Sequence, residues 1–490
     1  MKTQVNIKHE KQDVLLLVPP SINYNTPPLG LLYLAGVLEK NNIKVGVLDG
    51  ALEKLNLKET FQKIKEISPK IIGISVCTPD YPIINKFVFL IKQEFPNIKI
   101  VLGGPHATLD PEGVLLSPHV DYVVRREGEY SFLELVQAVL HDKLENLSKI
   151  LGLSYKENGK IINNQERPLI ENLDELPLPA RHLVPLMRYR NYGRIRKRVP
   201  VGVMITSRGC PLQCIFCAHE IFGRKYRFLS ARKVVDEIKY LQKEYGVKEI
   251  LFREDNFTAN RQRANEICDI ILKEKIDVTW MCLTDANSIT GELAIKMKKA
   301  GCWHIGIGVE SGNQEIQKVL KKNLSLERVR NVFKFVHDAG IKTLAFFMIG
   351  NYSDTKETVT DTINFAKSLD TDFAIFTITT PFPGTDLFNM AVDNKLITNF
   401  DFGMISNNPS LFKQKMPVLK TPKLSVEELR KLQLKAIFDF YLRPKQLFRI
   451  LKDKSLARAF LNIQPESYAH NIKVAKEIEE AYSNFPENKL

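Results

Sequence analysis

Residues 201–217 read Val-Gly-Val-Met-Ile-Thr-Ser-Arg-Gly-Cys-Pro-Leu-Gln-Cys-Ile-Phe-Cys. The run begins with apolar residues typical of a buried strand and continues into a loop that carries Cys210, Cys214 and Cys217. Iron–sulfur clusters ordinarily take four cysteine ligands, so a local set of three leaves one iron with an open position, as a catalytic metal requires. The stretch therefore predicts a catalytic iron–sulfur site at the end of a strand.

Two other interpretations of the three cysteines stay open at this point. A structural zinc site would need a fourth ligand, for which His219 is close enough in sequence, and the grouping could also arise by chance. The other cysteines stand in apolar contexts typical of small buried side chains. They are Cys77, Cys268, Cys282 and Cys302. Cysteines bunched in this way indicate metal binding or catalysis in a reducing compartment rather than a disulfide framework.

A series of alternating strands and helices begins with residue 201. Strand-like apolar runs occur at 201–206, 248–253, 278–283, 304–309, 342–349 and 373–378. Six βα units in succession predict a partial (β/α)6 TIM-type barrel over residues 201–390, with its active face at the C-terminal ends of the strands. The cysteine loop follows the first strand and is therefore expected on that face.

The N-terminal part has the pattern of a second α/β fold. Continuous Val/Ile/Leu runs alternate with helical segments, at 13–18, 45–48, 71–76, 100–102 and 122–124. Such runs indicate a parallel sheet covered on both faces, which predicts a doubly wound (Rossmann-like) domain over residues 10–142. Residues 143–200 are expected to form a hairpin and a proline-rich linker, and residues 391–490 a helical, basic C-terminal region.

The composition is that of an ordinary globular protein, with 490 residues, 44% of them hydrophobic and 26% charged. The formal net charge of +14 permits nucleic acid, an anionic membrane surface or an anionic substrate as partner, and a solvated basic surface accounts for it equally well. We expect no nucleic-acid partner. The sequence shows no signal peptide and no apolar run of membrane-spanning length, so a cytoplasmic protein is expected, with peripheral membrane contact as an alternative.

The cysteine motif, with Phe216 as its aromatic residue, resembles that of the radical S-adenosylmethionine (SAM) superfamily. The resemblance implies that the three cysteines hold a 4Fe–4S cluster whose free iron chelates SAM. It also implies that reduction cleaves SAM to methionine and a 5′-deoxyadenosyl radical. The ends of the second and fourth expected barrel strands also match the family. The implied SAM contacts at these ends and in the cysteine motif are Phe216, Glu254, Asp255, Gly308, Glu310 and Ser311.

Two positions depart from the pattern of that superfamily. Asp285 stands where many relatives carry arginine, which alters the charge expected near SAM. Asn351 follows Gly350 where the family often carries a glycine–proline pair, which leaves the contacts to adenine at that strand end undecided.

The N-terminal domain places two loops at strand ends, where doubly wound domains bind ligands. With Pro27-Pro28-Leu29-Gly30, these loops resemble the cobalamin-binding domain fused to many radical SAM enzymes, the class B radical SAM methyltransferase-like family. The implied cobalamin contacts are Thr78, Pro79, Tyr81, Gly103, Gly104, His106 and Glu127. The sequence has no Asp-x-His-x-x-Gly segment, so the resemblance implies base-off cobalamin. A domain that has lost cobalamin and only shapes the substrate channel is the alternative.

Together the resemblances imply a cobalamin-dependent radical SAM methyltransferase. One SAM would methylate cob(I)alamin, and the radical from a second would remove hydrogen from an unactivated substrate carbon, which then takes the methyl group from methylcobalamin. The alternatives are a radical SAM cyclase, oxidase or carbon–carbon coupling enzyme of lipid or tetrapyrrole metabolism, and a module with a structural iron–sulfur or zinc site.

The implied partners are a small-molecule or lipid-like substrate and an electron donor such as flavodoxin or ferredoxin. Residues 427–452 interleave aromatic and basic side chains. This pattern favours a helix packed on the barrel, and it also permits contact with anionic lipid heads.

Overall fold

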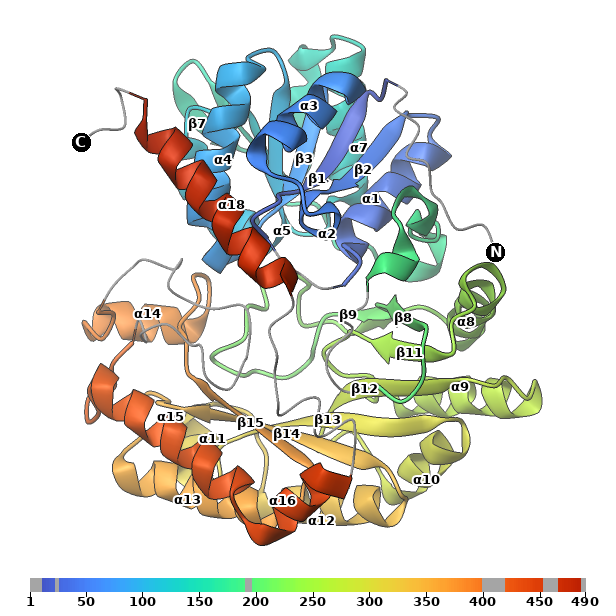
Figure 1. The fold of residues 1–490 in the computed structure, drawn as a ribbon, viewed down its shortest axis with the longest axis vertical. Helices are drawn as coiled ribbons and strands as arrows, with labels where there is room; N and C mark the ends of the chain where they lie inside the picture. The colour runs from blue at the N-terminus through green and yellow to red at the C-terminus, as the bar shows by residue number, and fades with distance from the viewer. Residues whose placement is uncertain (1–10, 23–25, 190–195, 399–418, 453–465, 486–490) are drawn as a thin grey trace.

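The computed structural model describes residues 11–22, 26–189, 196–398, 419–452 and 466–485. They form two α/β lobes stacked along the long axis of the molecule, the N-terminal lobe at the top of Figure 1 and the barrel below it. The predicted fold class, a doubly wound domain followed by a partial barrel and C-terminal helices, is confirmed. None of the helices among the described residues is long and apolar enough to cross a bilayer.

The N-terminal lobe is built on a seven-stranded sheet with the order β2-β1-β3-β4-β5-β6-β7. Its strands are β1 (Val14–Val18), β2 (Val45–Asp49), β3 (Ile71–Ser75), β4 (Lys99–Gly103), β5 (Tyr122–Val124), β6 (Leu153–Glu157) and β7 (Lys160–Asn163). Strands β1 to β5 pair in parallel, whereas β6 and β7 add antiparallel to β5. The hairpin expected in the linker is thus the edge of this sheet.

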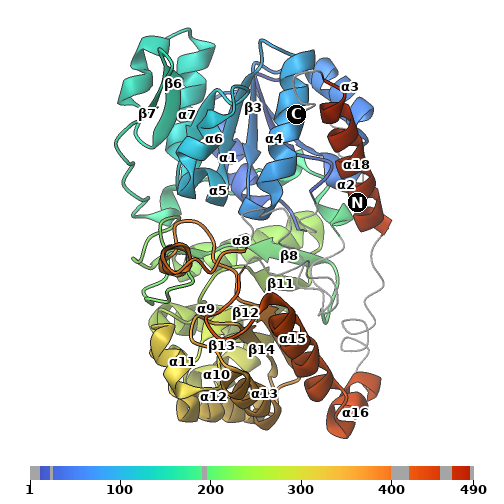
Figure 2. The same ribbon diagram turned by 90° about the vertical axis from the view of Figure 1, so that its left-hand side faces the viewer.

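Helices of the N-terminal lobe follow its strands as in a doubly wound fold. They are α1 (Leu29–Lys40), α2 (Gly50–Glu53), α3 (Leu57–Ile67), α4 (Tyr81–Glu94), α5 (Gly104–Leu109), α6 (Pro111–Leu116) and α7 (Gly128–Leu140). Because α5 begins where β4 ends, its position at the lower edge of the lobe shows that the strand ends face the barrel (Figures 1 and 2).

The barrel lobe is an open, all-parallel sheet with the order β15-β14-β13-β12-β11-β8. Its strands are β8 (Val201–Met204), β11 (Glu249–Phe252), β12 (Thr279–Asp285), β13 (Cys302–Glu310), β14 (Lys342–Ile349) and β15 (Phe373–Ile378). The helices of this lobe are α8 (Ala231–Tyr245), α9 (Arg261–Lys273), α10 (Gly291–Lys299), α11 (Gln314–Val319), α12 (Leu326–Asp338), α13 (Lys356–Ser368) and α14 (Asp386–Asp393). A small hairpin of β9 (Ser207–Arg208) and β10 (Arg227–Phe228) flanks the cysteine loop.

The two lobes share their apolar cores. Tyr33 and Val37 of α1 pack into the core of the barrel, and Val201 and Val203 of β8 pack into the core of the N-terminal lobe. A buried ion pair between Arg181 and Glu237, 2.6 Å long, fastens the connecting segment to α8. Exchange of core residues in both directions indicates one packed unit rather than two domains on a flexible linker.

Three helices of the C-terminal region lie on different lobes: α15 (Val426–Tyr441), α16 (Pro444–Lys452) and α18 (Glu466–Ser483). Helix α15 covers β15, where Gln433 and Tyr441 donate hydrogen bonds to backbone carbonyls of that strand. Helix α18 returns to the N-terminal lobe and packs on α4 (Figure 2). Helix α18 has four glutamates and two lysines, so it does not contribute to the basic character of the C-terminal region. Residues 399–418 and 453–465 of this region lie outside the described part of the chain.

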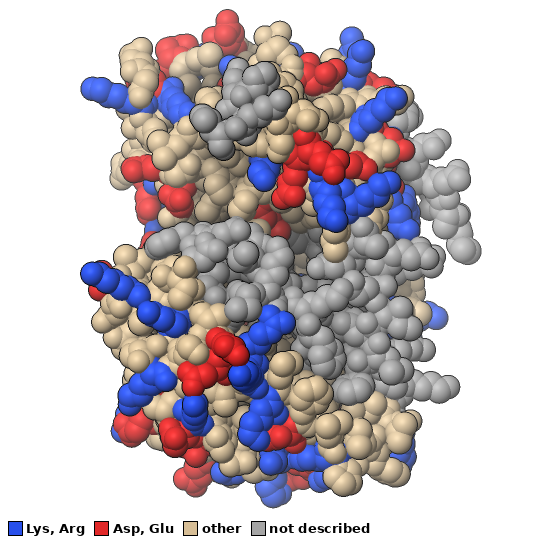
Figure 3. Space-filling model, turned by 60° about the vertical axis from the view of Figure 1, so that its left-hand side comes forward, with Lys and Arg blue, Asp and Glu red and all other residues tan. Residues whose placement is uncertain are grey.

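Charged side chains are spread over both lobes. On the face shown in Figure 3, Lys and Arg are intermixed with Asp and Glu. The net charge of +14 therefore does not form one continuous basic stripe on that face. Nucleic-acid surfaces usually have such a stripe.

Candidate active site

The cysteine loop leaves the barrel at the C-terminal end of β8 and is held from both sides. Gly209 has a φ of +83°, and a Cβ at that position would lie 2.3 Å from the carbonyl oxygen of Lys225, so only glycine is accommodated. Farther along, the Ile215 N–H donates to the carbonyl of Leu320 (3.2 Å) and the Leu387 N–H donates to the carbonyl of Ile215 (2.9 Å). These bonds fix the loop to the segments that follow β13 and β15.

The three cysteines of the loop have the character of cluster ligands. Cys214 is buried, and Cys210 and Cys217 are half-buried. Burial raises the pKa of Cys214 to about 11 and that of Cys217 to about 12, so iron would have to displace protons from these thiols on binding. Across the described residues, no set of three His, Cys, Asp or Glu side chains converges on a single ion, as structural zinc requires. A cluster, with one thiolate on each of three irons, suits these donors better.

Glu254, an expected SAM contact, is already occupied by the protein. It is buried, and its carboxylate accepts hydrogen bonds from the hydroxyls of Thr206 (2.6 Å) and Ser207. Arg263 lies 3.8 Å from the same carboxylate. Glu254 therefore orders the segment between β8 and the cysteines, and each of its oxygens already accepts a hydrogen bond from the protein.

Asp255, the neighbouring carboxylate, is in a different position. Its side chain is exposed, and no hydrogen bond or ion pair joins it to the described residues. Loss of hydration from neighbouring protein atoms nevertheless raises the pKa of its carboxyl. The charge of Asp255 also raises the pKa of Cys210 and Cys217, which shows that it stands close to the cysteine loop. Asp255 is therefore a carboxylate near the cysteine loop that has no hydrogen-bond or ion-pair partner among the described residues.

The end of β13 has a distorted backbone. Glu310 has a φ of +68°, and the pairing of β13 with β14 shifts register between Gly308 and Glu310. A Cβ on Gly308 would lie 2.6 Å from a Glu310 oxygen and 2.7 Å from Lys322 Nζ. The glycine therefore makes room for an ion pair, and such strained residues tend to gather at functional sites.

Lys322 is a member of the site that the sequence analysis missed. It is buried and donates to Glu310 at 2.6 Å. Burial acts to lower the pKa of Lys322, but Glu310 and Asp285 outweigh that effect and raise it. Asp285 is buried too, and its Oδ2 has no hydrogen-bond partner among the described residues. Asp285 stands where many relatives carry arginine, and Lys322, in the loop after α11, supplies a positive charge near this position.

Other expected positions prove to be structural. The Ser311 hydroxyl lies 3.2 Å from that of Thr362 and accepts from the N–H of Asn313, the residue whose side chain caps α11. Asn351 is buried between Asp354 and Thr379, to both of which its amide is hydrogen-bonded. Phe216 is half-buried, in an apolar cluster beneath the cysteine loop made by Ile215, Ile316, Leu320 and Leu387.

On the facing edge of the N-terminal lobe, the loops after β3 and β4 meet. Thr78 and Pro79 are buried in a short turn, and the ring of Tyr81 lies on that of His106 with centroids 4.3 Å apart. His106 is buried, both its ring nitrogens lack a hydrogen-bond partner in the described chain, and burial lowers its pKa. An orphaned, neutral imidazole at a ligand-binding edge fits a polar group of a bound cofactor.

The two glycines of that edge have a local explanation. Gly104 has a φ of +86°, and a Cβ on it would lie 2.5 Å from the Ser75 hydroxyl and 2.9 Å from the Val76 nitrogen. A Cβ on Gly103 would lie 3.3 Å from the carbonyl of Val124. Both glycines, which are implied cobalamin contacts, are therefore also needed for the close approach of neighbouring strand ends.

Glu127 requires a correction. We expected it to contact cobalamin, but its carboxylate accepts from Arg208 (3.0 Å), from Arg227 (2.8 Å) and from the N–H of Ile170 (2.7 Å). Because two guanidinium groups of the barrel occupy it, Glu127 joins the lobes instead of facing a ligand.

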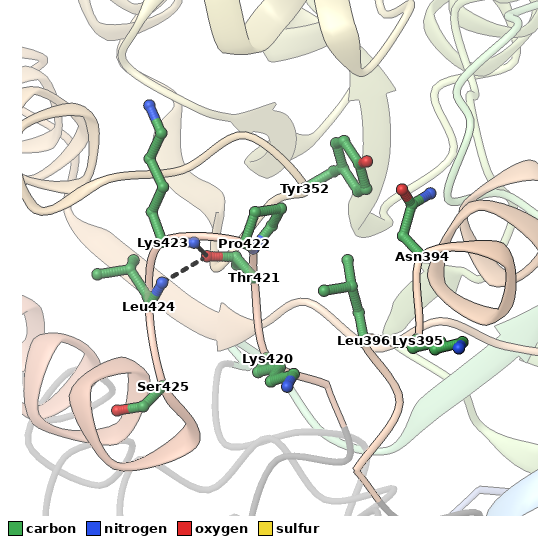
Figure 4. A pocket seen from close by; sticks show the side chains of 10 residues that line it. All are labelled: Tyr352, Asn394, Lys395, Leu396, Lys420, Thr421, Pro422, Lys423, Leu424 and Ser425. Atoms are coloured by element: carbon green, nitrogen blue, oxygen red, sulfur yellow. Dashed lines mark hydrogen bonds between the residues drawn. The ribbon is translucent and has the colours of Figure 1, made fainter.

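A surface cavity of about 660 Å³ lies outside the cysteine loop, between the end of α14 and the start of α15. Figure 4 shows its lining, in which Thr421 accepts from the backbone of Lys423 and Leu424. The cavity has lysines but no cysteine, histidine or carboxylate in its lining. It does not extend the site described above.

Comparison with known proteins places these features in a family. Residues 204–366 match the model of the radical SAM superfamily, and residues 18–136 match that of the B12 binding domain. An uncharacterized methyltransferase of Pyrococcus horikoshii is 38% identical over 446 residues, which cover 89% of this chain and 94% of that protein. The anaerobic magnesium-protoporphyrin IX monomethyl ester cyclase of Rubrivivax gelatinosus is 30% identical, covering 77% of this chain and 68% of that protein.

Among solved structures, the cobalamin-dependent radical SAM enzyme OxsB, with aqua-cobalamin and SAM bound, matches with a TM-score of 0.70 and 19% identity. The match covers 97% of this chain and 76% of OxsB, and at this identity it shows the fold. The family implies a 4Fe–4S cluster, SAM and cobalamin as cofactors. By its two domains and its long match to the Pyrococcus protein, the chain belongs to the cobalamin-dependent radical SAM methyltransferase family.

Proposed function

We propose that the protein transfers a methyl group to an unactivated carbon of a small molecule. The observation that carries the proposal is that the cysteine loop and the Tyr81–His106 edge belong to two lobes packed into one unit, each at the ligand-binding ends of its strands. When bound, the cluster and SAM supply the radical, and cobalamin supplies the methyl group. The protein's task is to orient these groups and to exclude water.

Three residues of the barrel are assigned to SAM. Asp255 is the free carboxylate near the cysteines, which suits the amino group of SAM. Lys322 carries the buried positive charge near Cys214, which suits the carboxylate of SAM. Glu310, held by Lys322 at 2.6 Å, is fixed at the strand end where ribose hydroxyls could be bound. Phe216 and Gly308 shape the floor beneath them.

In the N-terminal lobe, His106 and Tyr81 are assigned to cobalamin. The imidazole nitrogens are buried without partners, so a polar cofactor group would satisfy them. The base-off form remains part of the proposal.

The substrate is proposed to be apolar in part. Along the inner face of the barrel, the half-buried side chains are mainly apolar, namely Leu251, Leu283, Phe346, Met348 and Ile375. Such a lining favours a lipid-like or polycyclic substrate. A one-electron donor such as flavodoxin or ferredoxin is required, because reductive cleavage of SAM consumes an electron.

The test is to count products from SAM. The reconstituted, reduced protein, holding cobalamin, is given SAM with a deuterated methyl group and an extract of apolar metabolites. We expect S-adenosylhomocysteine and 5′-deoxyadenosine in equal amounts, with the labelled methyl group in one methylated product and in the methionine that is released together with 5′-deoxyadenosine. Sustained turnover to 5′-deoxyadenosine alone would contradict methyl transfer and favour a cyclase-type reaction, as in the Rubrivivax relative.

Peripheral membrane contact is also proposed, through α15 and α16. Exposed large apolar side chains gather there, at Phe438, Leu442, Leu447, Phe448 and Leu451. Lys445 and Lys452 flank them, a combination that suits an anionic lipid surface.

Flotation with anionic vesicles tests this contact. We expect Leu451→Ser, at a side chain that is 84% exposed, to weaken vesicle binding, and the control Leu116→Ser, at one that is 76% exposed on the N-terminal lobe, to leave it unchanged. Equal binding of wild type to zwitterionic vesicles, or no binding at all, would refute the contact.

A further inference from the structure

A buried cluster of charges joins the N-terminal lobe to the barrel beside the cysteine loop. Arg208 Nη1 lies 3.0 Å from Glu127 and Arg208 Nη2 lies 2.6 Å from Glu129, while Arg227 Nη1 lies 2.8 Å from both oxygens of Glu127. All four side chains are less than a tenth exposed. Two arginines meet two glutamates, so the cluster is neutral as a whole.

The barrel side of this cluster is directly connected to the iron ligands. Arg208 is separated from Cys210 only by Gly209, the position that tolerates no side chain. Arg227 pairs with Arg208 across β9 and β10 and donates to the carbonyl of Phe222, in the same loop (2.9 Å). A shift of the guanidinium groups would therefore move the cysteine loop.

The other side of the cluster is connected to the edge assigned to cobalamin. Arg126, next to Glu127, has a φ of +58°, and its N–H donates to the Thr108 hydroxyl at 2.8 Å. Thr108 lies in α5, the helix that carries His106, and its own hydroxyl reaches the carbonyl of Gly104. Two hydrogen bonds, through the Thr108 hydroxyl, thus connect α5 to Arg126, which the chain joins directly to Glu127.

We propose that Glu127 and Glu129 are positioning residues, which set the place of the cysteine loop relative to the cobalamin edge. The exposed pair of Arg126 and Glu220, 3.1 Å apart, ties the far end of the same loop to the same segment. A buried guanidinium that donates from both Nη atoms, as Arg208 does to Glu127 and Glu129, has a defined geometry, whereas packing of apolar residues tolerates small displacements. Methyl transfer needs such definition, because a displacement of about 1 Å in reacting groups can cost roughly 100-fold in rate.

The test measures the separation of the two metals without any substrate. A reduced 4Fe–4S cluster and cob(II)alamin both have unpaired electrons, so a nearby cluster speeds the relaxation of the cobalt signal in electron paramagnetic resonance. Iron content and cobalamin absorbance report the occupancy of each site separately, so the failure of either cofactor to bind is distinguishable from a change in their separation. This inference rests on the proposed binding of both cofactors in one protein.

The variants are Glu129→Gln, Arg208→Gln and their combination. Glu129 is hydrogen-bonded to Arg208, and Glu127 keeps Arg227 when both are replaced, so the double variant leaves no unpaired buried charge. We expect the double variant to melt near the wild-type temperature with both cofactors bound, yet its cobalt signal to saturate at lower microwave power. Arg208→Lys, which keeps the charge but cannot make both bonds, is expected to show the same change if the double variant does not fold.

A control for charge removal is Asp277→Asn, which breaks an exposed bidentate pair with Arg198 at the opposite end of the barrel (2.6 and 2.7 Å). It is expected to leave the cobalt signal unchanged. The proposal would be overturned if the cobalt signal of every folded variant of Arg208 and Glu129 saturated at the same microwave power as that of the wild type. The cluster of charged side chains would then contribute only stability.

Discussion

The cysteine loop and the cobalamin edge are two ligand-binding regions built in opposite ways. The cysteine loop carries its three proposed metal ligands within eight consecutive residues, Cys210 to Cys217, and its neighbours hold that segment in place. The edge of the N-terminal lobe gathers its residues from loops after β3 and β4, and His106 contributes two buried ring nitrogens without a hydrogen-bond partner among the described residues. Metal-ligating side chains can all lie in one short segment, whereas the residues that bind a large cofactor are distributed over several loops.

The largest effect expected from this contrast is at Cys214. Cys214→Ser removes one of three thiolates, so the cluster should be lost and 5′-deoxyadenosine should fall to background. Iron analysis and product chromatography measure both. Cys268→Ser, at a buried cysteine of α9 outside the loop, is the matched control and should keep both. Retention of iron and SAM cleavage by Cys214→Ser would show that the loop is not the metal site.

The second prediction concerns Lys322. Lys322→Met leaves Glu310 and Asp285 without their buried cation, and breaking such a pair costs about 3–5 kcal/mol. We expect a lower melting temperature and SAM binding weakened by about 10- to 100-fold, measured by equilibrium dialysis with the cluster in place.

Lys321→Met is the control for Lys322, because Lys321 is the preceding residue and is exposed. It should bind SAM like the wild type. Equal SAM affinity in both variants would remove Lys322 from the site and leave it a structural role.

A third prediction tests whether a change in the backbone of the cysteine loop affects iron binding without affecting cobalamin binding. Gly209→Ala places a Cβ against the carbonyl of Lys225 in a left-handed conformation, which costs more than about 1 kcal/mol. We expect less iron per protein after reconstitution, while cobalamin binding, followed by absorbance, stays the same. If cobalamin binding fell in parallel with iron, the two regions would not be separable at this position.

The smallest effect is expected at the cobalamin edge, because recognition is distributed there. His106→Ala should weaken cobalamin binding by about tenfold, the effect of roughly one lost hydrogen bond, without altering the iron content. Because burial lowers the pKa of His106, the imidazole is neutral at neutral pH, and cobalamin binding should not change between about pH 7 and 8. Unchanged affinity in His106→Ala would exclude the imidazole from the cofactor site.

The same contrast explains what the sequence could predict. The barrel strands at 342–349 and 373–378 appear as β14 and β15 with those bounds, because buried parallel strands are continuous apolar runs. Lys322 could not be found, since only the turn after α11 brings it to Glu310. Glu127 was misassigned because its partners, Arg208 and Arg227, lie 81 and 100 residues away, and no local pattern indicates such a pairing.

The most direct measurement is the electron paramagnetic resonance spectrum of the reduced, reconstituted protein with and without SAM. Three thiolates on four irons leave one iron open, so adding SAM should shift the signal of the cluster, and Cys214→Ser should show no cluster signal at all. A cluster signal that is identical at saturating SAM would contradict the account, because it would mean that no iron is available to the substrate.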